Sequence, residues 1–502
     1  MSRRPLGIVV AEPEEPNTLS CWAALVNVDA VKKDAFVVIE DAKRDGVKFV
    51  GRVVDIINRS MVLKEFTREE MLKFGKRAEE IVEGSLSKPE YFKALAKIRL
   101  LYKIDDNGIG LVDTPPVDTS PITGQGLQTL PTVLGLSRDP KTSISLGRLY
   151  AHPDVEVSLD LNRLLSGHIA IFGQTYSGKS YAAGVIIEEV VKRGVPVVVF
   201  DHMGEYLSME RAVDGGKGLD LIKLVPGSNA TMDFEDVMKN SQILTAVGVT
   251  DAQLNLLRDA YAEAKSRNHV GLKALEWLLE DVKTTKGEKR KRLYFIGRER
   301  GYSSATVDGL RWKLESLLNK GIVGKGFRAE DVIKPGHLTV VDLSNVEPSI
   351  RSLAVGAILN KIVESRKRGT IPPLLVVIEE AHNYATSDES PSSVIIRDLI
   401  RGARHHGIGV VLVSQRPSGI HRDALNIVNT YIVFRLKGTD LDYIKQFTPF
   451  TREELEDIQV LPEGVAYIAS PVIRGGLPIK IIIRKRTTVH GGESVKFVQP
   501  ST

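Results

Sequence analysis

The chain has 502 residues, of which 42% are hydrophobic, 26% charged and 6% aromatic, so it is globular and not disordered throughout. One cysteine, Cys21, excludes an intrachain disulfide and a cysteine-rich zinc site, and the net charge of +5 is too small to indicate nucleic-acid binding by itself. No apolar run approaches the ~20 residues of a membrane span, so we expect a cytoplasmic protein with no membrane segment. The few glutamines beside many charged residues favour a thermophilic source.

Residues 1–130 are predicted to form mainly β structure, and we expect a small β-barrel or β-sandwich there. Its short β-rich runs, separated by charged turn-like segments, are Leu6–Val10, Ala35–Ile39 and Lys48–Ile57. Thr67–Val82 is predicted as a helix that interrupts these runs. Proline, threonine and glycine are frequent near the end of this part, and residues 131–150 are predicted to be a linker.

From residue 151 the pattern changes to strand-like apolar runs that alternate with helical stretches. These runs are Ile169–Phe172, Val195–Phe200, Leu338–Val341, Leu374–Ile378, Val410–Val413, Ile432–Phe434 and Val465–Ile468. Continuous apolar runs are typical of strands buried on both faces of a mostly parallel sheet. We therefore predict an α/β core in two parts, 151–227 and 334–486. An all-α insertion is expected over 228–333, and residues 487–502 are predicted to be a polar tail or arm.

A phosphate-binding loop is predicted at Gly173–Ser180, which reads GQTYSGKS and matches the pattern G-x-x-x-x-G-K-[ST] in full. Its glycines allow backbone N–H groups to surround phosphate oxygens, Lys179 places a positive charge on the β- and γ-phosphates, and the Ser180 hydroxyl ligates Mg²⁺. A strand-like run precedes the loop and a predicted helix follows it. The predicted nucleotide-binding residues are Gly173, Gln174, Thr175, Tyr176, Ser177, Gly178, Lys179, Ser180 and Tyr181.

Two adjacent carboxylates are predicted to complete the hydrolytic site. Three apolar runs end in an acidic residue, at Asp201, Asp342 and Glu379. Only in the third run is the next residue, Glu380, also acidic. Hydrolysis needs one acid for the Mg²⁺ shell and another to orient and polarise the attacking water. We assign Glu379 to the metal and Glu380 to the water. Asp201 and Asp342 are interpreted as structural residues or as residues that support the side chains in contact with the metal.

Polar residues near the next strand are further candidates. Gln415 follows an apolar run, and we predict that its amide senses the γ-phosphate; a plain turn is the alternative. Arg397, Arg401 and Arg404 share one face of a predicted helix. An arginine brought to the γ-phosphate accelerates phosphoryl transfer, and Arg401 and Arg404 are the preferred candidates. A solvated or salt-bridged helix face is the alternative for them.

Other charged groups receive a simpler interpretation. A zinc site at the histidines is not supported by ligand spacing. These histidines are His382, His405 and His406. Two basic runs could contact DNA phosphates, although exposed basic runs are more often solvated. The first contains Lys286, Lys289, Arg290, Lys291 and Arg292, and the second contains Arg484, Lys485 and Arg486.

Taken in order, these motifs resemble those of the HerA family, archaeal hexameric DNA translocases of the FtsK–HerA division of RecA-like ATPases. The approach to the phosphate loop, VSLDLNRLLSGHIAIFGQTYSGKS, is similar to that of the family, and so is the polar turn DHMGEY at 201–206. The later motifs follow in the family's order as VVIEEAHN, RGARHHGIGVVLVSQRPS and LNIVNTYIVFRL. Tyr176 departs from the family, in which glycine is more typical at that position of the loop.

The resemblance implies a RecA-like P-loop ATPase with an N-terminal β-barrel and a helical insertion. It implies a homo-hexameric ring around double-stranded DNA, with ATP and Mg²⁺ between subunits and Arg401 or Arg404 acting on the neighbour's nucleotide. It also implies a NurA-type nuclease as partner in DNA end resection and recombinational repair. Two alternatives remain open: a nucleotide-gated scaffold for a nuclease, or a soluble packaging, secretion or conjugation-type motor.

Overall fold

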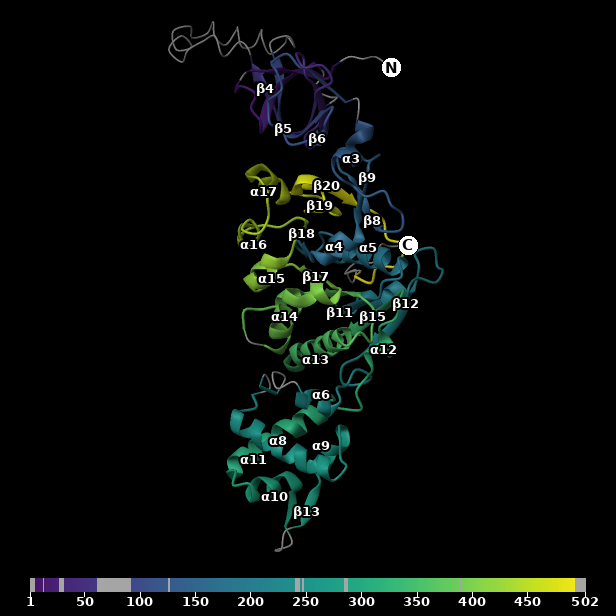
Figure 1. Cartoon of the computed structure of the whole chain (residues 1–502), viewed down its shortest axis with the longest axis vertical. Coiled ribbons are helices and arrows are strands. Elements are labelled where there is room, and N and C mark those ends of the chain that lie inside the picture. Colours follow the sequence, from purple (N-terminus) through teal and green to yellow (C-terminus); the bar gives the residue numbers. More distant parts are fainter. Residues whose placement is uncertain are drawn as a thin grey trace, which may run out of the picture. The chain divides into compact units, whose positions relative to one another are not determined.

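The protein is described by a computed structural model (Figure 1). The described residues are 5–11, 13–26, 31–60, 92–124, 127–239, 244–245, 248–283, 288–388 and 390–492. The chain forms two compact units. The first comprises residues 1–137, 147–157 and 479–482, and the second comprises residues 138–146, 158–478 and 483–502.

The first unit contains a closed β-barrel, which confirms the predicted barrel fold. Its strands are β1 (Gly7–Val10), β2 (Ser20–Leu25), β3 (Phe36–Glu40), β4 (Lys48–Ser60), β5 (Phe92–Asp105), β6 (Gly108–Gly110) and β7 (Pro121–Thr123). The order is β2-β1-β7-β3-β4-β5-β6, and pairing of β2 with β5 closes six of the strands into a ring. Alternate side chains such as Val9, Ile39, Phe49 and Ile98 fill the interior. The predicted helix Thr67–Val82 lies outside the described residues.

The second unit contains a mostly parallel sheet, and each strand-like run predicted after residue 151 forms one of its strands. In spatial order these strands are β12 (Asp220–Leu224), β15 (His337–Asp342), β11 (Val197–Asp201), β16 (Leu374–Ile378), β17 (Ile408–Ser414), β10 (Ile169–Phe172), β18 (Thr430–Val433) and β19 (Val465–Ala469). All neighbouring pairs are parallel except β18 and β19. This arrangement confirms the α/β core.

Helices cover the sheet and bury its apolar strands. They include α4 (Leu161–Ser166), α5 (Lys179–Lys192), α12 (Ala329–Val332), α13 (Pro348–Lys367), α14 (Pro391–His406), α15 (Arg422–Ile427), α16 (Thr439–Ile444) and α17 (Arg452–Ile458). Side chains of α13 and α14, such as Ile358 and Ile396, share one core with Phe200 and Val376 of the sheet. The strands are buried on both faces, which explains their continuous apolar sequences.

Three strands mark where the chain passes between the two units: β8 (Ser143–Leu149), β9 (Glu156–Asp160) and β20 (Ile479–Ile483). The predicted linker, 131–150, therefore contains a strand as well as most of the short helix α3 (Leu130–Val133). The apolar residues Ile144, Leu146 and Leu149 are buried in this segment, which explains why it is not a plain linker. The predicted domain limits remain predictions.

In its described residues the insertion contains helices and one short β-hairpin, which the prediction of an all-α insertion lacked. Its helices are α6 (Phe234–Lys239), α8 (Asp251–Ser266), α9 (Leu272–Leu278), α10 (Arg292–Glu299) and α11 (Ser304–Asn319), and the hairpin strands are β13 (Asp281–Lys283) and β14 (Lys289–Lys291). Leu257, Leu275 and Leu310 belong to its own apolar core.

The insertion leaves the sheet through a narrow neck. The Met232 N–H donates to the Ile322 carbonyl at 2.7 Å, and the Gly324 N–H donates to the Met232 carbonyl at 2.8 Å. At Gly321 a Cβ would lie 2.6 Å from the Gly227 carbonyl oxygen, so glycine permits the close approach of the two chain segments. Among the described helices, none combines the length and the hydrophobicity needed to cross a bilayer.

Candidate active site

The phosphate loop lies between β10 and α5, as its sequence predicts. The Gln174 N–H donates to the Arg435 carbonyl at 2.8 Å, and the Gln174 carbonyl accepts from Lys179 Nζ at 2.9 Å. A Cβ at Gly173 would lie 2.6 Å from Ser177 Oγ, and Gly178 has a φ of +108° immediately before α5. The loop therefore needs glycine at both positions. Helix α5 begins at Lys179, so its N-terminus lies directly at the end of the loop.

Tyr176 has a φ of +61°, in the left-handed region that glycine adopts without strain. This conformation explains why glycine is the more typical residue at this position. The Tyr176 side chain is 68% exposed and therefore meets no packing obstacle in the loop. Tyrosine in place of glycine adds backbone strain at this position. Gly178, Lys179 and Ser180 keep their places in the motif.

Glu379 and Glu380 lie where β16 ends, near the charge of Lys179. Glu379 is buried and accepts a hydrogen bond from the Tyr206 hydroxyl. Burial raises the pKa of Glu379 to about 8, although the Tyr206 hydrogen bond opposes the rise. Burial also raises the pKa of Glu380, whereas the nearby Lys179 ammonium lowers it. Two acids with different surroundings therefore face one lysine.

The Glu380 carboxylate has one oxygen without a hydrogen-bond partner. Its Oε2 is buried and lies 3.2 Å from His382 Nδ1, but no hydrogen bond to that atom is formed. The Gln415 backbone N–H also lowers the pKa of Glu380 by hydrogen bonding to the carboxylate. Glu380 has a φ of +46°, a strained conformation for a non-glycine residue. The strained backbone presents an acid with a free acceptor atom.

Gln415 connects the carboxylates with the phosphate loop. It follows β17, and its side-chain Oε1 accepts a hydrogen bond from Thr175 Oγ1 at 2.9 Å. Since its backbone N–H reaches Glu380, one residue contacts both halves of the site. The structure thus brings together Lys179, Glu379, Glu380 and Gln415, which are far apart in the sequence.

Asp201 supports a turn. Its carboxylate accepts backbone N–H groups of Gly204 at 2.8 Å, Glu205 at 3.2 Å and Tyr206 at 2.9 Å. Asp342 accepts from Ser344 and forms an ion pair with Lys223 at 2.9 Å. Both contacts agree with their interpretation as structural residues.

Sequence reasoning missed two residues of the site, Glu205 and Tyr206. Tyr206 binds Glu379, and the Glu205 charge raises the pKa values of Lys179, Glu379 and Glu380. The available signal was the motif DHMGEY, which follows a buried strand at the edge where the phosphate loop also lies. The Asp201 turn is what directs these two residues toward the site.

The candidate arginines lie on α14. Arg401 donates to Asp423 Oδ2 of α15 at 2.7 Å, with 56% of its side chain exposed. The Arg404 side chain lies outside the described part of the structure. Within one chain, the Arg401 contact is therefore the salt-bridged alternative; a role on a neighbouring subunit remains a prediction.

The end of the described chain packs against α5. Arg486 is buried, with its guanidinium over the ring of Tyr181 at 5.8 Å, and its backbone N–H donates to the Tyr181 hydroxyl at 2.8 Å. The Thr488 N–H donates to Glu188 Oε1 of α5 at 2.8 Å. This packing leaves Arg486 inaccessible to DNA and makes residues 487–492 part of the fold. Residues 493–502 of the predicted tail lie outside the described residues.

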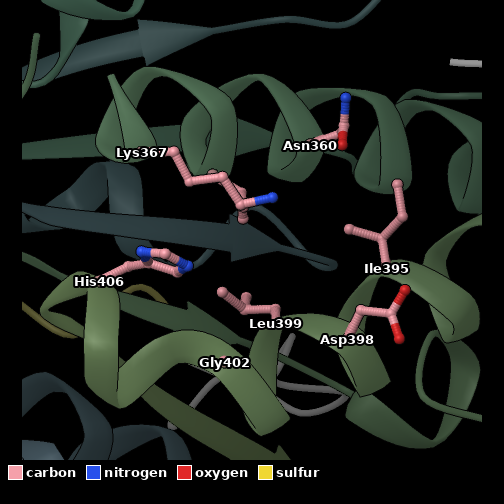
Figure 2. Close-up of a pocket in the computed structure, with 8 residues that line it drawn as sticks. Asn360, Lys367, Ile395, Asp398, Leu399, Gly402 and His406 are labelled. Atoms are coloured by element: carbon pink, nitrogen blue, oxygen red, sulfur yellow. The ribbon is translucent and has the colours of Figure 1, made fainter. Parts of the chain in front are cut away.

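A pocket of about 410 Å³ lies between α13 and α14, away from the phosphate-loop residues (Figure 2). Lys367 and His406 extend into it from the ends of the two helices, and Leu399 contributes an apolar side chain. No cluster of three or more metal-ligating side chains occurs among the described residues.

The site fits a nucleotide and a divalent cation. The glycines of the loop leave a cradle that side chains would fill, and Lys179 supplies a positive charge for phosphates. The Ser180 hydroxyl and the Glu379 carboxylate are hard oxygen ligands of the kind that Mg²⁺ prefers. The orphaned Glu380 Oε2 is an acceptor suited to a proton.

Comparison with known proteins shows which family the chain resembles. The family described as "Helicase HerA, central domain" matches residues 144–362. A DNA double-strand break repair helicase HerA of Pyrococcus furiosus is 26% identical over 90% of this chain and 89% of its own length. The chain resembles HerA helicases over most of its length. A HerA helicase of Sulfurisphaera tokodaii is 28% identical over 78% of each chain.

The fold of this chain is also similar to that of a solved structure, VirB4 of Thermoanaerobacter pseudethanolicus. That structure superimposes with a TM-score of 0.52 at 16% identity, covering 70% of this chain and 97% of that chain. At this identity the likeness shows the fold alone. The resemblance to HerA predicted from the motifs and the predicted fold class are thus both confirmed.

Proposed function

We propose that this chain is an ATP-driven translocase or helicase of double-stranded DNA that acts in DNA repair. The observation that carries the proposal is the meeting of Lys179, Glu380 and Gln415 at one edge of the sheet in a chain that resembles HerA helicases. The relatives named above are DNA double-strand break repair helicases. ATP hydrolysis by such a site supplies the free energy for movement along DNA.

The residues of the chain divide the hydrolytic work. Lys179 and the loop N–H groups bind the phosphates, and Ser180 with Glu379 would hold Mg²⁺. When bound, Mg²⁺–ATP supplies the phosphoryl group and a divalent charge that offsets negative charge in the transition state. Glu380 Oε2 accepts a proton from the attacking water, and burial strengthens it as a base because it raises its pKa. Gln415 couples this acid to Thr175 of the loop.

The same proposal includes the oligomeric state, the partner protein and the arginine that acts between subunits. The active unit is a homo-hexamer, a NurA-type nuclease is its partner in end resection, and Arg401 or Arg404 acts on the nucleotide of the neighbouring subunit. For Arg401 to act in trans, its ion pair with Asp423 of its own chain would have to open. An arginine that acts at the γ-phosphate of its own chain would be expected among the residues that contact the loop.

The first experiment measures steady-state ATP hydrolysis with Mg²⁺ and no nucleic acid, single-stranded DNA or duplex DNA. We expect duplex DNA to stimulate hydrolysis strongly and Glu380→Gln to remove the stimulated activity. Hydrolysis that is indifferent to DNA would contradict the motor and favour a nucleotide-gated scaffold. Absence of hydrolysis under every condition would contradict the ATPase itself.

A second experiment tests the arginine in trans. Subunits with Arg404→Ala and subunits with Lys179→Ala are mixed, because a mixed ring contains interfaces with an intact loop and an intact arginine. We expect partial recovery of hydrolysis compared with either variant alone. Mixed rings of proven composition that stay inactive would contradict a trans role of Arg404.

A further inference from the structure

The helical insertion has a positively charged end, made by the hairpin β13–β14, helix α10 and Arg300, and called here the basic end. Figure 1 shows β13 and α10 together at one extremity of the insertion. The described residues of 280–300 include seven basic and four acidic side chains, an excess of three positive charges, compared with five for the whole chain. The exposed basic residues are Lys283, Lys289, Arg290, Arg298 and Arg300.

Ion pairs divide these charges into an inner and an outer group. Lys291 pairs with Asp281 at 3.1 Å and Arg292 pairs with Glu280 at 2.5 Å, and both pairs fasten the base of the hairpin. The outer group, which consists of Lys289, Arg290, Arg298 and Arg300, has weaker ion pairing. Arg290 lies 3.7 Å from Glu288, and no ion pair joins Lys289, Arg298 or Arg300 to any described residue. The outer charges are therefore available to an anionic partner.

Aromatic rings hold the outer arginines in place. The guanidinium of Arg290 lies 4.4 Å from the centre of the Tyr294 ring, and that of Arg298 lies 6.0 Å from it. A guanidinium that packs on a ring loses little further freedom when its N–H groups bind an oxyanion, and its fork matches phosphate geometry. Tyr294 thus packs against two guanidinium groups that can donate hydrogen bonds to phosphates.

The same packing argues against base recognition. Trp277 is stacked on His269 at 5.3 Å with the rings inclined by 20°, and the Arg292 guanidinium lies 4.5 Å from its centre. Tyr294 is covered by Arg290 and Arg298. With these aromatic faces occupied, the surface offers charge rather than a stacking platform for unpaired bases.

We propose that the basic end of the insertion is a DNA-binding surface that contacts the phosphate backbone of duplex DNA without reading its sequence. This proposal rests on the proposed function, in which duplex DNA is the substrate. Lys289, Arg290 and Arg298 provide the principal contacts. Each neutralised phosphate releases condensed counterions, so the contacts contribute to the salt dependence of binding.

The test compares DNA binding by the full chain and by a triple variant, Lys289→Gln, Arg290→Gln and Arg298→Gln, using fluorescence anisotropy of labelled duplex DNA at several salt concentrations. We expect the Kd at 0.1 M salt to rise by about tenfold and the slope of log K against log salt to fall by about 2 to 3. ATP hydrolysis without DNA is expected to stay unchanged, because none of these residues lies in the active site.

Two matched variants separate charge at this place from other effects. Lys217→Gln, Arg328→Gln and Arg452→Gln remove three charges from exposed positions elsewhere, where 75%, 76% and 88% of the side chains are accessible. Arg290→Lys with Arg298→Lys keeps the charge but weakens the packing on Tyr294. We expect the first to bind like wild type and the second to retain most of the binding.

The outcomes are distinguishable from failure of the proposed function. The proposal would be overturned if the triple variant and the Lys217, Arg328 and Arg452 control bound DNA equally well. This holds whether both variants bind like wild type or both lose affinity to the same extent. A preference for single-stranded DNA that disappears in the triple variant would also overturn it, because it would indicate base stacking. If wild type itself does not bind DNA, the proposed function fails rather than this surface. Thermal unfolding midpoints confirm that each variant is folded.

Discussion

Replacement of Glu380 by glutamine is the sharpest test of the hydrolytic site. Glutamine has the same shape, keeps an oxygen that accepts the Gln415 N–H, and places an amide where Oε2 now lies near His382. It cannot accept a proton, and loss of a general base typically costs about 10²- to 10⁴-fold in kcat, or about 3 to 5 kcal/mol in activation free energy. Burial disfavours the Glu380 charge, so a neutral amide is not expected to destabilise the fold.

Nucleotide binding is expected to survive this substitution. Lys179 retains the charges of Glu379 and Glu205, and the phosphate loop is untouched. The assay is steady-state hydrolysis with saturating duplex DNA, beside equilibrium binding of a fluorescent ATP analogue. Glu205→Gln is the matched control, because it removes a charge near Lys179 without removing the base. Near-normal kcat in the Glu380→Gln protein, or an equal loss in both variants, would refute the assignment.

Three further predictions concern the same site. Lys179→Ala is expected to weaken nucleotide binding at least tenfold, measured by equilibrium titration; unchanged binding would contradict the phosphate assignment. Burial raises the pKa of Glu379 from 4.5 to about 8, so the folded chain keeps a proton that the unfolded chain releases between these values. The free energy of unfolding should therefore fall as pH rises through this window, by about 1.4 kcal/mol per unit, and Glu379→Gln should abolish that fall in denaturant titrations. Thr175→Val removes the hydrogen bond to Gln415 and is expected to lower kcat several-fold with little change in KM; a change confined to KM would show that the contact serves binding alone.

Local sequence was sufficient for the phosphate loop and most of the sheet. The loop is one continuous motif. Strands buried on both faces have continuous apolar sequences, which differ from the periodic pattern of a surface helix. Strand β12 was not predicted, because its sequence DLIKL has only one fully buried residue, Leu224, and lies at the edge of the sheet. Edge strands carry a weaker apolar signal than central ones.

Contacts between distant segments explain what the sequence alone did not predict. The hydrogen bond from Tyr206 to Glu379 depends on the turn at Asp201, which brings a residue from beyond β11 to the end of β16. The hairpin β13–β14 contains Lys289–Lys291, which have little intrinsic preference for strands, and it is held by ion pairs to Glu280 and Asp281. In both places tertiary contacts decide the local structure.

The neck at Met232 and Ile322 has a consequence for how the insertion can vary. The hydrogen bonds there hold the two ends of residues 233–321 together. The conformational entropy lost when this loop closes is therefore independent of the pairing of strands in the sheet. The pairing of β12 with β15 lies outside that loop, so we expect changes in the length of the loop to leave the pairing intact. The insertion also packs on α13, because Leu353 and Ala357 belong to its apolar core and Lys361 pairs with Asp236 at 2.6 Å. An exchange of residues 232–322 would therefore have to keep the face that packs on α13.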